Sequence, residues 1–71
     1  MTRLIEDRVL LAEETLDAYV DLRGDDYDDD MGLVTDILTD IMHFCEDKGK
    51  DFEGAVRTAT EHFTHEQEEE A

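Results

Sequence analysis

Residues 28–48 constrain the fold of this 71-residue chain more than any other segment, and they read DDDMGLVTDILTDIMHFCEDK. Apolar side chains recur there at steps of three and four, the spacing that puts residues on one face of an α-helix. This face comprises Val34, Ile37, Leu38, Ile41, Phe44 and Cys45. The opposite face carries the aspartates Asp29, Asp36, Asp40 and Asp47. The pattern predicts an amphipathic helix with a row of carboxylates along its outer side.

A first helix is predicted before this segment. It runs from a cap at Thr2 to about Leu22, with Arg23 in its last turn and Gly24 as its stop. Its apolar positions form two neighbouring stripes, which is more than one contact face requires. Either two helices of the same chain cover this wide apolar arc, or a second copy of the chain does.

A third helix is predicted after the central one. Lys48 and Gly49 end the central helix, and a short loop leads to Asp51, a sound N-cap. The third helix should therefore fold back against the second as an antiparallel hairpin. Its apolar face comprises Phe52, Ala55, Val56, Ala59 and Phe63. Gly54, inside this helix, indicates either a close approach of two helices or a frayed first turn.

The chain ends in the acidic run 66–70. Acids at the C-terminal end of a helix oppose its dipole, so this run is expected to fray. The predicted fold is therefore all-α. It is a small three-helix bundle with a C-terminal helical hairpin, forming one domain over residues 1–65, followed by a frayed acidic tail over residues 66–71.

Charge narrows the range of partners. The chain has 22 Asp and Glu against 6 Lys and Arg, a net charge of −16. A polyanion repels nucleic-acid phosphates and anionic membranes, so we expect no direct contact with either and a basic protein as partner. A single cysteine, no apolar run long enough to span a bilayer and no signal peptide indicate a cytoplasmic protein.

No arrangement of side chains typical of catalysis is found, so neither an enzyme activity nor a cofactor is predicted. Cys45 lies on the apolar face and is interpreted as a buried structural thiol. His43 is two residues away, and on a helix it therefore points to another side.

The sequence also contains residues that could bind a metal ion, but their pattern is too incomplete to predict a metal site. The loop Asp25–Asp30 resembles the calcium loop of an EF-hand when it is counted from Asp26. Met31 then stands where glycine belongs, and Ile37 stands where the bidentate acid belongs. A solvated acidic loop whose last aspartate caps the next helix is the favoured reading. The other candidate ligands are His43, His62 and His65.

Two explanations of the acidity remain open. In the first, ordered carboxylates imitate DNA, which carries about one charge per 1.7 Å of axis, and occupy a basic groove. The residues assigned to partner binding are Asp29, Asp36, Asp40 and Asp47, supported by Glu13, Asp17 and Asp21. In the second, the acids reflect a high-salt cytosol that screens their repulsion. A mimic concentrates its acids on one surface, whereas salt adaptation scatters them.

Residues 33–63, LVTDILTDIMHFCEDKGKDFEGAVRTATEHF, resemble a recurrent pattern in small proteins of plasmids, phages and integrated elements. That pattern has a DLLTDLMHWC-like helix, a short Gly loop and a DFxxALRxAxxHF-like helix, and Phe44 replaces its usual Trp. The matching positions are Asp36, Leu38, Asp40, Met42, His43, Cys45, Gly49, Asp51, Phe52, Ala55, Arg57, Ala59, His62 and Phe63. The resemblance implies no catalytic residue. In size and acidity the chain also resembles anti-restriction and anti-CRISPR proteins that imitate DNA.

The predicted function is therefore that of a non-catalytic acidic binding protein. It would act as a nucleic-acid mimic and block a basic DNA- or RNA-binding surface of a host defence complex. The alternative is a salt-adapted helical accessory or interaction module of a mobile element. In that case the surplus apolar surface would serve to form a homodimer.

Overall fold

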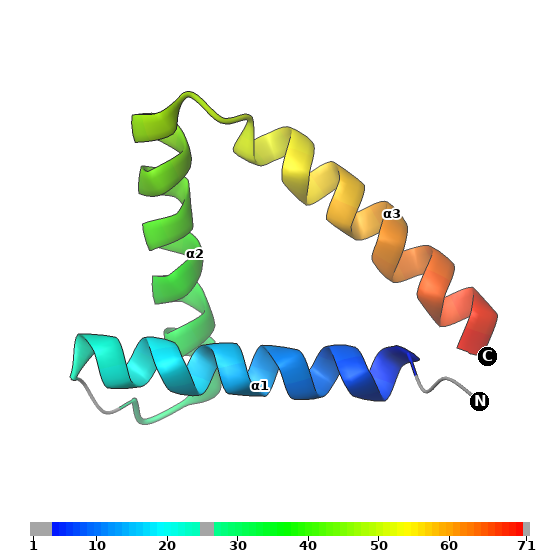
Figure 1. Ribbon diagram of the computed structural model, residues 1–71, viewed down its shortest axis with the longest axis horizontal. Coiled ribbons are helices and arrows are strands. Elements are labelled where there is room, and N and C mark those ends of the chain that lie inside the picture. Colours follow the sequence, from blue (N-terminus) through cyan, green and yellow to red (C-terminus); the bar gives the residue numbers. More distant parts are fainter. Residues whose placement is uncertain (1–3, 25–26, 71) are drawn as a thin grey trace.

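The computed structural model describes residues 4–24 and 27–70, and within these ranges every regular element is a helix. The helices are α1 (Leu4–Arg23), α2 (Asp30–Lys48) and α3 (Phe52–Glu70). They form the sides of an open triangle in which α2 rises from the C-terminal half of α1 and α3 returns towards its start (Figure 1). The predicted all-α bundle of three helices is confirmed.

Two glycines end helices as the sequence predicts. Gly24 and Gly49 have φ angles of 75° and 66°, in the left-handed region that glycine adopts at little cost. The Gly24 N–H donates to the Val20 carbonyl at 2.8 Å, and the Lys50 N–H donates to the Cys45 carbonyl at 2.8 Å. The cap predicted at Thr2 lies outside the described residues.

The start of α2 differs from the prediction by one residue. Asp29, and not the last aspartate of the loop, is the N-cap, and its Oδ1 accepts a hydrogen bond of 2.7 Å from the Gly32 N–H. Asp30 is instead the first helical residue, where its charge complements the positive end of the helix dipole.

The start of α3 explains Gly54. The Asp51 carboxylate caps the helix as predicted, because its Oδ1 accepts a hydrogen bond of 3.0 Å from the Gly54 N–H. A Cβ atom on Gly54 would lie 2.9 Å from the Asp51 Cγ, closer than side chains pack. Glycine at this position therefore leaves room for the cap, and it belongs to the first turn and not to a contact between helices.

The substitution Gly54→Ala should bring no gain in the free energy of unfolding, although Ala is favoured over Gly in a helix by about 1 kcal/mol. The new methyl group displaces the Asp51 carboxylate, and losing an N-cap costs about 1 kcal/mol. In an Asp51→Ala background there is no cap to lose, so Gly54→Ala should stabilise by about 1 kcal/mol. Denaturant unfolding of the four proteins measures both effects. An equal gain in both backgrounds would show that the two residues are independent.

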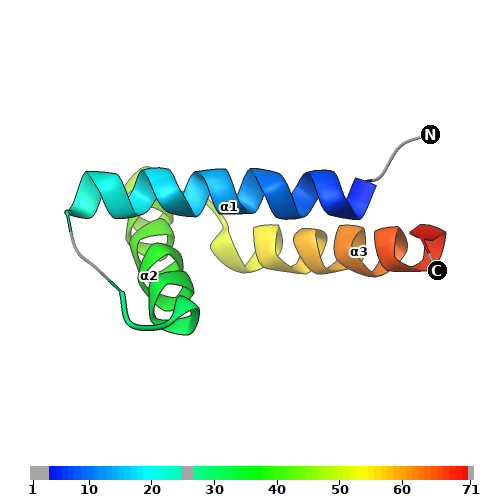
Figure 2. The ribbon, with the colours of Figure 1, turned by 90° about the horizontal axis from the view of Figure 1, so that it is seen from below.

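The acidic segment at the chain end is helical in the structure, where fraying was expected. Helix α3 continues without a break to Glu70, and Ala71 lies outside the described residues. A contact far apart in sequence accounts for this difference. The Arg8 Nη2 lies 2.9 Å from the Glu66 Oε2, which ties the last turns of α3 to the first turns of α1. In both views the end of α3 lies beside the start of α1 (Figures 1 and 2).

The bundle is open. Its radius of gyration is 14.1 Å, against about 11 Å for a compact domain of this length. Leu33, 8% exposed, is the single buried side chain of the described residues. The loop at 49–51 reverses the chain as predicted for a hairpin, but α2 and α3 diverge from it (Figure 1). Most of the apolar side chains that the sequence assigns to a core therefore remain partly in solvent.

Candidate acidic binding surface

The acids of α1 gather on one side of the helix. At 3.6 residues per turn, all six fall within about a third of its circumference. All are exposed, and together we call them the α1 acidic face: Glu6, Asp7, Glu13, Glu14, Asp17 and Asp21. From Glu6 to Asp21 the helix rises about 22 Å, so the average step between carboxylates is about 4.5 Å, with a gap of about 9 Å between Asp7 and Glu13. A DNA strand carries one phosphate per about 3.4 Å.

The fold extends this face onto the first turn of α2. An open hollow between the two helices is lined by carboxylates and leucines. Its lining residues are Leu10, Glu13, Glu14, Leu16, Asp17, Asp30 and Leu33. Asp30 is thereby brought beside acids that precede it by more than ten positions in the sequence. Together with Asp30 of α2, the α1 acidic face therefore forms an acidic surface that spans two helices, with Leu10 among its acids.

The two central aspartates of the row predicted on α2, Asp36 and Asp40, make contacts within the fold. The Tyr27 hydroxyl donates a hydrogen bond of 2.8 Å to the Asp36 Oδ2. The Tyr19 hydroxyl donates one of 2.5 Å to the Asp40 Oδ2, which also lies 3.7 Å from the Arg23 Nη1. These two carboxylates connect α2 to α1 and to the segment before α2. They do not form part of a free outer strip.

The ends of the row are also separated. Asp29 accepts the capping hydrogen bond described above, and the Asp47 carboxylate is exposed, 3.5 Å from the Lys48 Nζ. Of the residues assigned to partner binding, the structure thus leaves Glu13, Asp17 and Asp21 together on one exposed surface. Sequence reasoning did not assign Asp7, Glu14 or Asp30 to this site, although a helical projection of residues 4–23 already places the first two on the α1 acidic face.

The contact between Tyr27 and Asp36 changes the acidity of the phenol. Loss of hydration at the half-buried ring and the hydrogen bond to the Asp36 carboxylate raise the pKa of Tyr27 to about 12. The same two causes, with Asp40 as the acceptor, raise the pKa of Tyr19. Both hydroxyls therefore stay protonated, as hydrogen-bond donors, well into the alkaline range.

Stability should consequently be lost in alkaline solution. A tyrosine of the unfolded chain ionises near pH 10, whereas folded Tyr27 ionises near pH 12. Because the folded pKa is the higher one, this contribution is complete below about pH 10 and is lost as the pH rises towards about 12. Helicity and tyrosinate absorbance followed through an alkaline titration measure the loss. In Tyr27→Phe the decline should be shallower, and an unchanged decline would contradict the assignment to Tyr27.

Acids on α3 are distributed differently. Five of them spread over more than half of its circumference: Glu53, Glu61, Glu66, Glu68 and Glu69. Glu66 contacts Arg8 of α1, and the Glu69 Oε1 lies 3.3 Å from the His65 Nε2. The acids are therefore concentrated on α1 and scattered on α3.

Within the described residues, the candidate metal ligands do not come together in one site. In residues 4–24 and 27–70, no group of three His, Cys, Asp or Glu side chains is placed to hold a metal ion. His65 contacts Glu69, and His62 borders a separate shallow hollow on α3. Asp26, the first position of the calcium-loop comparison, lies outside the described residues.

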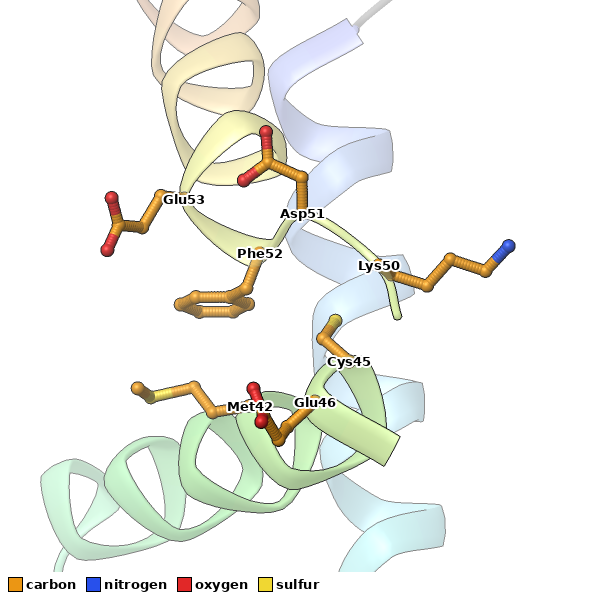
Figure 3. A pocket seen from close by; sticks show the side chains of 7 residues that line it. All are labelled: Met42, Cys45, Glu46, Lys50, Asp51, Phe52 and Glu53. Carbon is orange, nitrogen blue, oxygen red and sulfur yellow. The ribbon is translucent and has the colours of Figure 1, made fainter. Parts of the chain in front are cut away.

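Cys45 is a free, half-buried thiol at the junction of α2 and α3. With Met42 and Phe52 it lines a hollow that Glu46 and Glu53 border (Figure 3). Its neighbours are apolar or acidic apart from Lys50, whose side chain points away from the hollow (Figure 3). The thiol is therefore only half-buried, where the sequence predicts a buried one.

Comparison with known proteins found no matching family model, no matching curated protein and no matching solved structure. None of the described helices is both long and apolar enough to cross a membrane. The α1 acidic face is accordingly the feature on which a functional proposal rests.

Proposed function

We propose that this protein is a non-catalytic binding protein that offers the α1 acidic face to a basic nucleic-acid-binding surface, in place of nucleic acid. The observation that carries the proposal is the set of exposed carboxylates on one side of α1, whose average step of about 4.5 Å along the axis is comparable with the step of about 3.4 Å between phosphates of a DNA strand. A helix holds these charges in fixed register, so less ordering is needed on binding than for a disordered acidic tail. Electrostatic steering would also speed the encounter.

Among basic partners, we favour a DNA- or RNA-binding complex of host defence, of the kind that anti-restriction and anti-CRISPR proteins block in the cytoplasm. Two features support this choice. The chain combines small size with a net charge of −16, and residues 33–63 resemble proteins of mobile elements. One feature is the overall composition and the other is a sequence pattern, so together they indicate a class of target.

A second candidate function is a salt-adapted interaction module of a mobile element. The scatter of acids around α3 favours it, as does the use of Asp36 and Asp40 inside the fold. In this case the acids keep the protein soluble in a high-salt cytosol, and its partner contacts are apolar. The two candidates differ in whether nucleic acid and this protein compete for one partner.

Displacement of DNA from purified defence complexes tests the proposal. Restriction enzymes and CRISPR effectors are loaded with labelled duplex DNA at about 0.15 M salt, a condition of moderate screening. The intact protein should displace DNA from at least one of them. A polyglutamate chain of equal charge is the control for acidity without fixed register, and it should compete much more weakly. Equal competition by polyglutamate, or no displacement from any complex, would contradict the proposal.

A further inference from the structure

A large apolar surface remains partly exposed to solvent within the described part of the chain. It is formed by α2 and α3 and consists of Leu38, Ile41, Met42, Phe52, Val56 and Phe63, which we call the apolar surface. Five of these side chains are at least 40% exposed, and Phe52 is half-buried. Isolated exposed apolar residues are ordinary on a soluble protein, whereas a contiguous set marks a contact surface.

The parts of this surface are continuous. The α2 and α3 stripes meet at the hollow beside the 49–51 loop, where the Met42 side chain lies next to the Phe52 ring (Figure 3). At the other end of α3, Phe63 lines a second hollow together with Ile5, Val9 and Ala12 of α1. The apolar surface therefore follows α2 and α3 and reaches α1.

The middle of each stripe is uncharged, and charged side chains border the surface at its ends. On the side of α2 that carries Leu38 and Met42, no charged residue occurs between Met31 and Cys45. On the side of α3 that carries Val56, Glu53 is the one charged residue between Phe52 and Phe63, and it borders the hollow where the two stripes meet. A neutral strip offers nothing to a basic partner, which would be drawn to the α1 acidic face instead.

The accessible surface area of the chain exceeds that of a compact protein by enough to form an interface with a second copy. The chain exposes 6094 Å², whereas a compact protein of 8.2 kDa exposes about 4,500 Å². If each of two copies covered half of that excess, the interface would bury about 1,600 Å² in total, the size of a typical stable interface. We infer that two copies of this chain associate through the apolar surface. Each copy thereby completes the core that it lacks alone.

Association of two chains that each carry −16 is opposed by repulsion, so it should strengthen with salt. Sedimentation of the intact protein at about 0.05 M and about 1 M KCl should show the mass of a dimer, favoured at the higher salt. The midpoint of thermal unfolding should rise with protein concentration, because association stabilises the folded state by mass action. A folded monomer at every concentration and salt would overturn the inference.

A matched pair of variants locates the interface. Val56→Glu puts a charge on the apolar surface and should weaken association at least about tenfold. Leu22→Glu puts the same charge on an apolar residue of α1 that is 87% exposed and should leave association unchanged. A dimer that survives Val56→Glu with unchanged affinity would also overturn the inference. If Val56→Glu does not fold, the concentration dependence of wild-type unfolding decides. This inference is independent of the proposed mimicry, since a monomer can still displace DNA and a dimer can fail to.

Discussion

The substitution Leu33→Ala is expected to remove most of the free energy of unfolding at ordinary salt. Leu33 is the single buried side chain of the described residues, and it lies where α2 meets Leu10 and Leu16 of α1. Truncating a buried leucine costs about 2–5 kcal/mol, and the open hollow beside this site favours the lower half of that range. A core in a chain this small supplies only about 3–5 kcal/mol, so little net stability would remain.

Helicity measured against denaturant tests this expectation, with Leu22→Ala as the matched control. Leu22 loses the same atoms, but it is 87% exposed, and its truncation should change the free energy of unfolding by less than about 0.5 kcal/mol. Similar losses in the two variants would show that the contact around Leu33 does not hold α1 and α2 together.

Salt should stabilise the chain strongly. Five pairs of acids among the described side chains stand three or four positions apart on the same helix: Glu13 and Asp17, Glu14 and Asp17, Asp17 and Asp21, Asp36 and Asp40, and Glu66 and Glu69. Each like-charged pair costs a few tenths of a kcal/mol, so about 2 kcal/mol of unfolding free energy should be recovered by screening. The Debye length falls from about 10 Å at 0.1 M to about 3 Å at 1 M salt. At 1 M it is therefore shorter than the distance between the two charges of a pair, and their repulsion is screened.

The gain is measured as the free energy of urea unfolding at about 0.05 M and about 1 M KCl, at one protein concentration. The variant Glu13→Gln/Asp17→Asn/Asp21→Asn removes three of the pairs, so its salt dependence should be about half as steep. Stability that does not change with salt in the wild-type protein would mean that repulsion within helices is already compensated elsewhere.

Local chemistry made much of this fold predictable. A glycine with positive φ ends α1 at Gly24 and α2 at Gly49, and a carboxylate at Asp51 begins α3. Each of these features depends on a few neighbouring residues, which the sequence displays directly. The observed N-cap of α2 lies one residue before the predicted one. The loop contains several adjacent aspartates, and the side chain of any of them can accept the capping hydrogen bond.

Contacts between distant segments were not predictable in the same way. The aspartate row of α2 is regular in sequence, but the side of α2 that α1 crosses depends on how the two helices pack. Tyr19 of α1 therefore reaches Asp40, and Tyr27 reaches Asp36. The same holds for Arg8 and Glu66, which are 58 positions apart and support the helical end of α3.

The role of the α1 acidic face is tested most directly by the affinity of two variants for a defence complex from which the wild-type protein displaces DNA. Each variant loses three negative charges. One is Glu13→Gln/Asp17→Asn/Asp21→Asn on α1, and the other is Glu53→Gln/Glu61→Gln/Glu68→Gln on α3. Three exposed charge contacts at a few tenths to 1 kcal/mol each predict an affinity about tenfold lower for the α1 variant. The α3 variant should bind almost as well as wild type. Equal losses in the two variants would contradict recognition of an ordered acidic face and would mean that only net charge matters.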